Sequence, residues 1–345
     1  MGKTEKIHEM FDEIAPEYDH LNHLMSLDFD KTWRRRALKH IVPSTGRNTD
    51  RTKAFSAAPA SSPDSNQSPA AASGSSPNRS NSPVSSTPPA AASGNVNDGN
   101  AESYHVLDIA CGTGDFSIAI ARRMVSKGLA QAPSQDGLPA TNLSAGSRLS
   151  SSETPAQSAS CRATPESARN TSDEAQPGQL APVTGLDLSE GMLEVMRKKV
   201  QQKGLDGIIS CEQGNSESMR FADASFDCVT IAFGIRNFEH REAALREILR
   251  VLKPGGRLVI LELSTPTIPV IRGLFKFYFT RVSPLLGAKV AGNKAAYSYL
   301  PASVLAFPGK KEWMQTMRDC GYSRVMHRAF TFGICRMYIG FKDFR

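Results

Sequence analysis

A short run of residues in the first third of the chain joins a buried strand to a glycine turn and a new helix. Residues 106–115 read Val-Leu-Asp-Ile-Ala-Cys-Gly-Thr-Gly-Asp, and apolar residues recur at helical spacing over 116–121. Gly112 and Gly114 lack the Cβ atoms that keep a backbone away from a bound molecule, and they adopt angles closed to other residues. The run therefore predicts a ligand site at the end of a strand.

The residues around this turn argue against a pyrophosphate ligand. A dinucleotide-binding turn has a third glycine three residues after Gly114, where this chain has Ser117, and an acid, Asp115, opens the helix. An acid at a helix N-terminus suits a ligand with positive charge or with hydroxyl and ammonium donors, such as the methionyl part of S-adenosylmethionine. A glycine turn alone also occurs in many ordinary tight turns.

Two further strand ends carry polar residues of the right kind. Asp187 ends a predicted strand over 183–187, and a carboxylate there can accept hydrogen bonds from both hydroxyls of a ribose. Asn215 and Ser216 follow a predicted strand over 208–213, and they could read the edge of an adenine. The alternatives are a helix cap by Asp187 or Ser189 and an ordinary Gly-Asn turn.

The rest of the chain repeats the alternation of strand and helix. Such alternation predicts a parallel sheet covered by helices, with a binding crevice at the carboxyl ends of the strands. We expect further strands over 226–233 and 257–263, a helix from about 241 to 252 that Pro254-Gly255-Gly256 stops, a helix over 310–319, and two antiparallel strands within 322–342.

Two stretches rich in Ser, Pro and Ala interrupt this pattern. Residues 44–103 contain one aromatic residue, Phe55, and residues 127–181 contain none. Segments this poor in large apolar side chains cannot offset the entropy lost on ordering, so we interpret both as disordered insertions, either passive or regulatory. The remainder of the 345 residues suits one domain: a core over 104–126 and 182–345, preceded by a helical segment over 1–43.

Together these segments resemble a class I S-adenosylmethionine-dependent methyltransferase, and specifically the quinone C-methyltransferases of menaquinone and ubiquinone synthesis. The Ala-Pro-Glu-Tyr-Asp and Phe-Gly-Ile-Arg-Asn segments are narrow signatures, whereas the glycine turn is shared by the whole class. The resemblance extends over residues 11–19, 21–26, 33–36, 233–238 and 252–258.

The resemblance implies a Rossmann-like α/β fold, with a mostly parallel seven-stranded sheet and helices on both faces. It implies S-adenosylmethionine as cofactor and a prenylated quinol as substrate: demethylmenaquinol, or alternatively a benzoquinol or another small acceptor. By the same resemblance residues 1–43 form a lid over the cofactor. The cofactor residues expected are Asp108, Gly112, Thr113, Gly114, Asp187, Asn215 and Ser216, whereas Ala232 departs from a serine found in some relatives.

Three residues are candidates for the catalytic step. Arg236 follows the fourth predicted strand, where substrate and cofactor meet, and its guanidinium can stabilise a developing phenolate; the alternative is a structural salt bridge. Asn237 could orient the same oxygen. Tyr18 could orient the quinol or relay its proton, as could Asp19 and Asn22. Histidine is a common general base near neutral pH, but nothing else singles out His20, His23 or His240. Tyr297 and Tyr299 are weaker candidates for the quinol pocket.

The net charge of +7 suggests an anionic partner, either nucleic acid or anionic lipid. The densest basic cluster, at 31–39, has no RNA-binding signature around it, and we interpret it as a solvated helix face. We expect contact with a membrane surface and no nucleic-acid partner. A nucleic-acid-binding protein that keeps this fold without catalysis is the alternative class. Residues 270–282 combine basic and apolar side chains; we favour a core helix packed on the sheet, with an interfacial membrane helix as the alternative.

The N-terminal residues contain no apolar run of the secretory type, so we expect a cytoplasmic protein, with peripheral contact at the inner face of the membrane. The six cysteines form no Cys-x-x-Cys pair, which favours reduced thiols and no metal site. A homodimer is a further expectation that no motif tests.

Overall fold

The computed structural model describes residues 3–15, 18–19, 23, 26, 28–43, 103–131, 180–282 and 294–344. These residues all belong, apart from Ser103, to one compact unit formed by Met1–Ser44 and Tyr104–Arg345. Residues 44–102 and 132–179, nearly all of the two insertions expected from composition, lie outside the described residues. Their disorder therefore stays a prediction.

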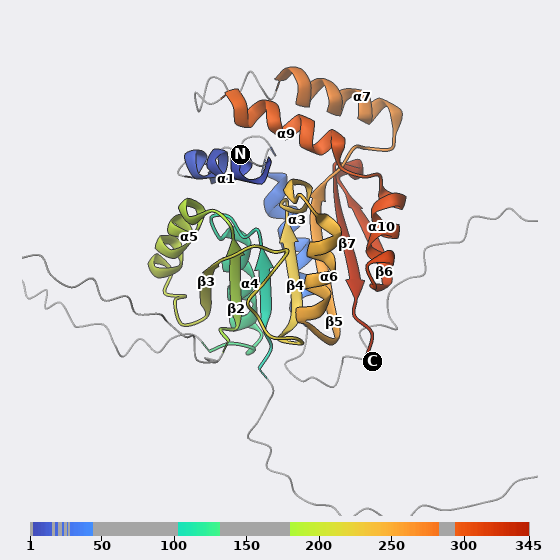
Figure 1. Ribbon diagram of the computed structural model, residues 1–345. Coiled ribbons are helices and arrows are strands. Elements are labelled where there is room, and N and C mark those ends of the chain that lie inside the picture. Colours follow the sequence, from blue (N-terminus) through green and yellow to red (C-terminus); the bar gives the residue numbers. More distant parts are fainter. Residues whose placement is uncertain are drawn as a thin grey trace, which may run out of the picture. The chain divides into compact units, whose positions relative to one another are not determined.

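Seven strands form a single sheet in the order β3-β2-β1-β4-β5-β7-β6 (Figure 1). The neighbours among β1 to β5 pair in parallel, and β7 runs antiparallel to both β5 and β6. This arrangement confirms the mostly parallel seven-stranded α/β sheet. The strands are β1 (Val106–Ile109), β2 (Val183–Asp187), β3 (Ile209–Gln213), β4 (Phe226–Ala232), β5 (Leu252–Leu263), β6 (Ser323–Phe330) and β7 (Cys335–Phe341).

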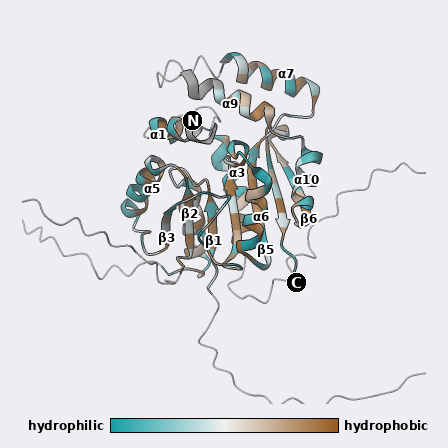
Figure 2. Ribbon diagram, in the orientation of Figure 1, coloured by the Kyte–Doolittle hydropathy of each residue, from teal (hydrophilic) through white to brown (hydrophobic). Residues whose placement is uncertain are grey.

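Helices cover both faces of the sheet, as expected. On one face α3 (Phe29–Ile41) packs against α4 (Asp115–Ser126), and on the other α6 (Arg241–Val251) packs against α10 (Lys310–Asp319). Because both faces are covered, the central strands are apolar along their length, and Figure 2 shows them mostly in brown. Leu107, Ile109 and Ile231 are each at most 1% exposed. The sheet is thus a rigid base for the loops at its carboxyl edge.

One boundary differs from the expectation. Leu252 to Gly256 belong to β5 and do not simply end the preceding helix, because Leu252 pairs with Phe226 before an irregularity in register. Gly255 has a φ of +74° at this irregularity and donates its N–H to the Lys342 carbonyl at 3.1 Å. The Pro-Gly-Gly sequence therefore makes a bulge inside the strand.

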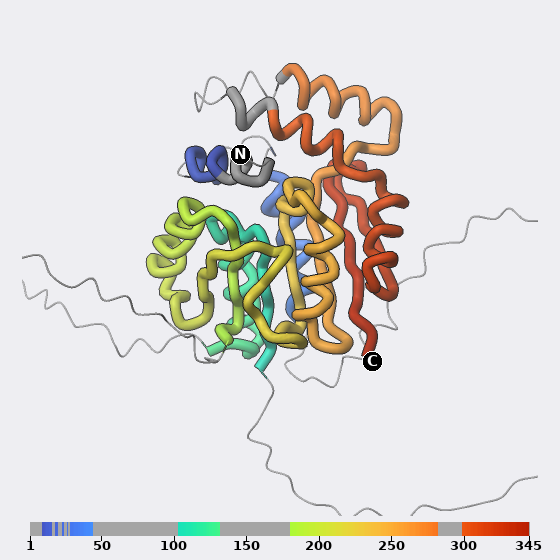
Figure 3. Tube along the Cα trace, viewed as in Figure 1, coloured from blue at the N-terminus to red at the C-terminus, as the bar shows by residue number. Residues whose placement is uncertain are grey.

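Three helices lie beyond the carboxyl ends of the parallel strands (Figures 1 and 3): α1 (Lys3–Ile14), α7 (Pro269–Phe277) and α9 (Lys294–Ala306). In Figure 3, α1 in blue lies above the green α5 (Glu190–Gln202), which it contacts. A π-helical turn (Tyr278–Val282) continues α7. These elements add a second layer above the edge of the sheet where the binding crevice was expected.

The preference for a core helix at residues 270–282 is wrong. In α7 only Phe275 is buried, while Val270, Leu274 and Phe277 are 71%, 63% and 62% exposed. The apolar stripe of this helix therefore faces away from the sheet. Among the helices that the structure describes, none is long and apolar enough to cross a bilayer.

Candidate active site

A cavity of about 300 Å³ opens between the carboxyl ends of β1, β2, β3 and β4. Its size falls at the lower end of the range of small-molecule sites, and its position is the crevice that open α/β sheets use for ligands. The lining includes backbone of the first glycine turn, polar side chains after β2 and β3, and aromatic rings from the N-terminal segment and from β4 onward. Residues on its wall include Phe11, Tyr18, Gly112, Asp187, Ser189, Met192, Asn215, Ser216, Phe233, Asn237 and Phe238.

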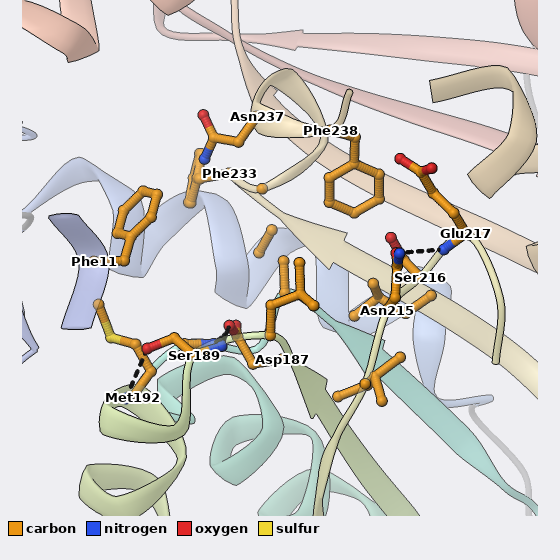
Figure 4. Close-up of a pocket in the computed structure, with 18 of the residues that line it drawn as sticks. Phe11, Asp187, Ser189, Met192, Asn215, Ser216, Glu217, Phe233, Asn237 and Phe238 are labelled. Carbon is orange, nitrogen blue, oxygen red and sulfur yellow. Dashed lines mark hydrogen bonds between the residues drawn. The ribbon is translucent and has the colours of Figure 1, made fainter. Parts of the chain in front are cut away.

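Asp187 is held rigidly at the edge of this cavity (Figure 4). One carboxylate oxygen accepts the Gly112 N–H at 2.8 Å, and the other accepts the Ser189 N–H at 2.9 Å. Ser189 itself caps α5 by accepting the Met192 N–H at 3.1 Å. The serine therefore performs the capping that was the alternative role for Asp187. The carboxylate is left oriented along the cavity wall, where a vicinal diol would meet it.

The two glycines of the turn have different roles. Gly112 lines the cavity with a φ of +56°, and a Cβ there would lie 3.6 Å from the Tyr18 ring. Gly114 has a φ of +82° and does not line the cavity; a Cβ there would lie 2.5 Å from Cγ of Met196 on α5. The expected cofactor contact of Gly114 is thus replaced by close packing of two helices.

Asn215 and Ser216 both line the cavity opposite Asp187 (Figure 4). The Oδ1 atom of Asn215 accepts the Glu217 N–H at 2.9 Å, which fixes the turn after β3. Ser216 is 7% exposed. The ordinary turn and the predicted position beside a base are therefore compatible, because the turn holds these two residues at the cavity.

Asp108 and Thr113 lie beneath the turn and not in the larger cavity. Both carboxylate oxygens of Asp108 are occupied by hydroxyl donors, Ser117 at 2.6 Å and Thr230 at 2.7 Å. Thr113 donates its hydroxyl to Asp19. The two residues border a small cavity of about 30 Å³ that shares Tyr18, Gly112 and Phe233 with the larger cavity. Asp108, expected among the cofactor-binding residues, thus supports the turn through these hydrogen bonds, and its role toward a cofactor stays a prediction.

Burial raises the pKa of Asp108 to about 6, and the donated hydrogen bonds of Ser117 and Thr230 oppose that rise. The folded pKa lies above the unfolded value of about 3.9, so the stability that Asp108 contributes is fully present below about pH 4 and is lost as the pH rises through the folded pKa.

The variant Asp108→Asn tests this pH dependence, because an asparagine side chain cannot ionise. We therefore compare the free energies of unfolding of the variant and of the unsubstituted protein, measured with urea. The difference, variant minus unsubstituted protein, should be more positive at about pH 7 than at about pH 4, by roughly 2 to 3 kcal/mol. A stability difference that is the same at both pH values would contradict the burial of an ionisable carboxyl at Asp108.

A second cavity, of about 340 Å³, adjoins the first and has mostly apolar walls. Tyr18 and Phe233 line both cavities, so these two rings form the partition between them. Phe233 has a φ of +62°, an uncommon conformation for a bulky residue that tends to occur at functional sites. The remaining walls come from α3, α7, the turn after α7, α9 and the loop after β6, and include Phe29, Trp33, Leu263, Ile271, Leu274, Phe275, Tyr278, Phe279, Leu300, Phe332 and Ile334.

Arg236 lines the second cavity and is also part of a buried ion pair. Its Nη1 atom donates to Glu262 at 2.8 Å and to the Phe233 carbonyl, and Glu262 is fully buried. The structural salt bridge weighed as an alternative is therefore present. The Nε atom of Arg236 is buried and has no hydrogen-bond partner among the described residues, so the ion pair does not use every donor of this guanidinium. Both roles are compatible with the geometry.

Asn237 lines the first cavity, and its Oδ1 atom accepts the Tyr299 hydroxyl at 3.0 Å. Tyr299 comes from α9, and burial raises the pKa of its phenol. This bond ties the upper layer to the 3-10 turn Ile235–Asn237. The Tyr297 side chain, Asn22 and His20 lie outside the described residues. His240 lines the outer edge of the first cavity and pairs with Glu217 at 3.0 Å.

Comparison with known proteins identifies the family. The model of the ubiE/COQ5 methyltransferase family matches residues 1–52 and 93–342. The chain belongs to the ubiE/COQ5 methyltransferase family. A demethylmenaquinone methyltransferase of Bacteroides fragilis is 31% identical over 99% of this chain and 94% of its own length. A ubiquinone/menaquinone biosynthesis C-methyltransferase of Geotalea daltonii is 32% identical over 99% and 97%, and a demethylmenaquinone methyltransferase of Deinococcus radiodurans is 32% identical over 99% and 94%.

The match to the ubiE/COQ5 family covers every residue that lines the two cavities. Its gap, residues 53–92, falls within the first predicted insertion. Among solved structures, a SAM-dependent methyltransferase from Aquifex aeolicus aligns with 70% of this chain and 82% of its own, at 14% identity and a TM-score of 0.40. The family assignment does not depend on that distant likeness.

In this family member, an ionic network that the sequence did not reveal fastens the N-terminal segment to the glycine turn. Lys199 on α5 pairs with Asp19 and, at 2.9 Å, with Asp115. Arg34 on α3 pairs with the same Asp115 at 3.2 Å. Asp12 on α1 accepts hydrogen bonds from the Ser189 hydroxyl and, at 3.2 Å, from the Gly191 N–H. These partners are far apart in sequence and share no motif, so the sequence did not predict these contacts.

A cluster in this network also has the composition of a weak metal site. His23, Asp28 and Asp30 each place a ligand atom within 4.8 Å of the others. Asp28 pairs with Lys31 at 2.7 Å, and Asp30 lies 3.4 Å from Arg34. Cationic partners already balance these carboxylates, so we interpret the cluster as ion pairs.

Proposed function

We propose that this chain transfers a methyl group from S-adenosylmethionine to a ring carbon of demethylmenaquinol, a prenylated naphthoquinol. The observation that carries the proposal is the pairing of a polar, strand-end cavity with an apolar cavity across the Tyr18 and Phe233 partition. A water-soluble acceptor would not need the apolar cavity. The names of the relatives support the quinol, and both a menaquinone and a ubiquinone pathway occur among them.

The first cavity suits the parts of S-adenosylmethionine. The oriented carboxylate of Asp187 would accept from the ribose hydroxyls, and Asn215 and Ser216 would lie along the adenine. Gly112 leaves room at the turn. The small polar cavity beside it has charges of both signs, Asp115 and Arg34 among them, which suits a zwitterionic amino-acid end.

The cofactor supplies an electrophilic sulfonium methyl group. The chain's own residues would then have to position the quinol ring, exclude water and accept the proton of the quinol. The apolar walls of the second cavity would hold the naphthoquinol ring and the start of its tail. Arg236 would stabilise the negative charge that develops on the quinol oxygen. The partition of Tyr18 and Phe233 sets where the ring carbon meets the methyl group.

The benzoquinol alternative is tested by competition. Purified full-length protein is given labelled S-adenosylmethionine and equal amounts of short-chain demethylmenaquinol and of the corresponding benzoquinol lacking the same methyl group, both kept reduced. We expect the naphthoquinol to have the higher kcat/KM. Preference for the benzoquinol would move the protein to the ubiquinone pathway, and labelling of neither would overturn the proposed function.

We further propose that α7 rests on the surface of an anionic membrane. Its exposed side chains Val270, Leu274 and Phe277 are apolar, and Lys276 beside them is basic and exposed. Leu274 also lines the apolar cavity, so the cavity reaches the surface at this helix. Apolar residues interleaved with basic ones are typical of interfacial helices. A quinol tail could then remain in the bilayer while its ring enters the protein.

Substituting Asp at Val270 and Phe277 together should reduce binding to phosphatidylglycerol vesicles by at least about tenfold, because burying each side chain contributes on the order of 1.5 kcal/mol or more. Neither residue lines a cavity, so turnover of a short-chain quinol in solution should stay unchanged. Met326→Asp, at an exposed residue of similar character on β6, is the control. Vesicle sedimentation measures the effect, and equal binding of all three proteins would refute the membrane role of α7.

A further inference from the structure

Asp30 is a buried carboxylate on the wall of the apolar cavity. It lies in the first turn of α3 and is 3% exposed. Its oxygens accept the Ser26 hydroxyl at 2.7 Å, lie 3.1 Å from Nδ1 of His23, and lie 3.4 Å from Nη1 of Arg34. Among the described residues that line this cavity, Asp30 is the only one with a carboxylate.

Asp30 lies close to the partition between the two cavities. Two residues that follow it on α3 contact Phe233: the Trp33 ring centroid lies 6.1 Å from that of Phe233, and the Arg34 guanidinium lies 5.7 Å from it. Phe233 in turn faces the cofactor cavity. Arg236 opens onto the same apolar cavity as Asp30. A ring bound there would have an anionic and a cationic side chain available near the point of transfer.

The reaction needs a proton acceptor, and the other candidates on the wall of the apolar cavity do not supply one. Arg34 and Arg236 are donors only, because a guanidinium has no acceptor site and does not lose its proton in proteins, so neither takes a proton from a phenol. The Tyr18 and Asn237 side chains are neutral at working pH and weakly basic. A carboxylate can act as a general base, and Asp30 places one on the wall of this cavity.

We propose that Asp30 accepts the proton of the quinol hydroxyl during methyl transfer, an inference that rests on the proposed function. The proton moves to the carboxylate, and the oxygen electrons enter the ring. A ring carbon then bonds to the methyl group, while the electron pair of the broken carbon–sulfur bond stays on sulfur. The methylated ring loses its hydrogen as a proton to water, and its electrons restore the aromatic ring. The quinol oxygen takes its proton back from Asp30.

His23 is a positioning residue in this scheme. Its Nδ1 atom faces Asp30 at 3.1 Å, and its Nε2 atom lies 3.5 Å from Asp115. The imidazole thus connects the carboxylate of the apolar cavity to the ionic network at the glycine turn. Ser26 fixes the other side of the same carboxylate. These contacts reach both oxygens of the Asp30 carboxylate and limit its rotation.

The test compares Asp30→Asn with Asp28→Asn in the full-length protein. Asparagine keeps the shape of Asp30 but accepts no proton, so we expect kcat at about pH 7 to fall by on the order of 100-fold or more, which is a typical contribution of a general base. The KM for short-chain demethylmenaquinol should change less than about threefold, because the variant and the unsubstituted protein bind the quinol through the same contacts. Asp28 is exposed and paired with Lys31, and asparagine tolerates its left-handed backbone, so this control should retain full activity.

A second readout separates a proton acceptor from a structural residue. Without the base, log kcat should rise by about one per pH unit as the quinol ionises by itself, because its phenol titrates near about pH 10. Affinity for S-adenosylhomocysteine, measured by calorimetry, should not change. Should Asp30→Asn fold poorly, Asp30→Ala with added formate tests the same proton acceptor. Formate is a small carboxylate, so the rate of this variant should rise in proportion to the formate concentration.

The outcomes are distinguishable from failure of the proposed function. Unsubstituted protein that methylates no quinol overturns that function. Where the unsubstituted protein is active, an Asp30→Asn rate within about threefold of it overturns the role of Asp30. So does a parallel loss of S-adenosylhomocysteine binding, or an Asp30→Ala enzyme that formate does not restore, because either marks Asp30 as structural.

Discussion

Replacing Arg236 with Met is expected to lower turnover by on the order of 100-fold, because the donor that stabilises the quinol oxygen is lost. The same substitution should lower the free energy of unfolding by about 3 to 5 kcal/mol, because it leaves the fully buried Glu262 carboxylate without its cation. Turnover and urea unfolding measure the two effects separately. A loss of stability without a loss of turnover would reduce Arg236 to a structural salt bridge.

A double variant separates the two effects. Glu262→Gln combined with Arg236→Met removes the orphaned charge, so most of the lost stability should return while turnover stays low. Arg246→Met is the matched control, because Arg246 pairs with Glu242 on the surface, where each side chain is at least 59% exposed. Such pairs contribute about 1 kcal/mol or less. A double variant with full turnover would contradict any role of Arg236 beyond the ion pair.

Replacing Asp187 with Ala is expected to weaken S-adenosylmethionine binding by about 3 kcal/mol, on the order of 100-fold. Two losses combine. The ribose hydroxyls lose their charged acceptors, and the backbone N–H groups of Gly112 and Ser189 lose the carboxylate that holds them in place. Calorimetry with S-adenosylhomocysteine measures the effect without turnover.

The control for Asp187 is Glu190→Ala. Glu190 lies three residues further along and pairs with Arg197 on the surface of α5, outside the first cavity. Its loss should leave affinity unchanged. Equal affinity of the Asp187→Ala protein and the unsubstituted protein would show that the carboxylate orders the turn but does not contact the nucleoside.

Local patterns in the sequence were sufficient for the fold and for half of the cofactor cavity. Asp187 ends β2, whereas Asn215 and Gly112 follow β3 and β1. In a parallel sheet such strand ends gather at one edge, so the proximity of the three residues follows from the strand assignment. All three line the cavity as expected. The roles of these residues toward a ligand remain predictions.

The surroundings of several other residues depend on long-range packing, which local sequence patterns do not reveal. Gly114 looked like a ligand contact, but Met196 on another helix approaches it, and no motif links the two. Asp30 was not singled out at all, because an acid in the first turn of a helix is ordinary; its burial depends on the cavity that α7 and α9 complete. The exposure of α7 was likewise hidden, since a helical stripe of apolar residues has the same pattern whether it faces a sheet or a membrane.

The most direct test of the central claim follows a labelled methyl group. Full-length protein is incubated with S-adenosylmethionine carrying a ¹³C methyl group and with reduced short-chain demethylmenaquinol, and the product is examined by NMR and mass spectrometry. The two adjoining cavities predict a single ¹³C methyl group bonded to a ring carbon, and none with the Asp187→Ala protein at limiting cofactor. A label on oxygen, or no labelled quinol, would contradict the account.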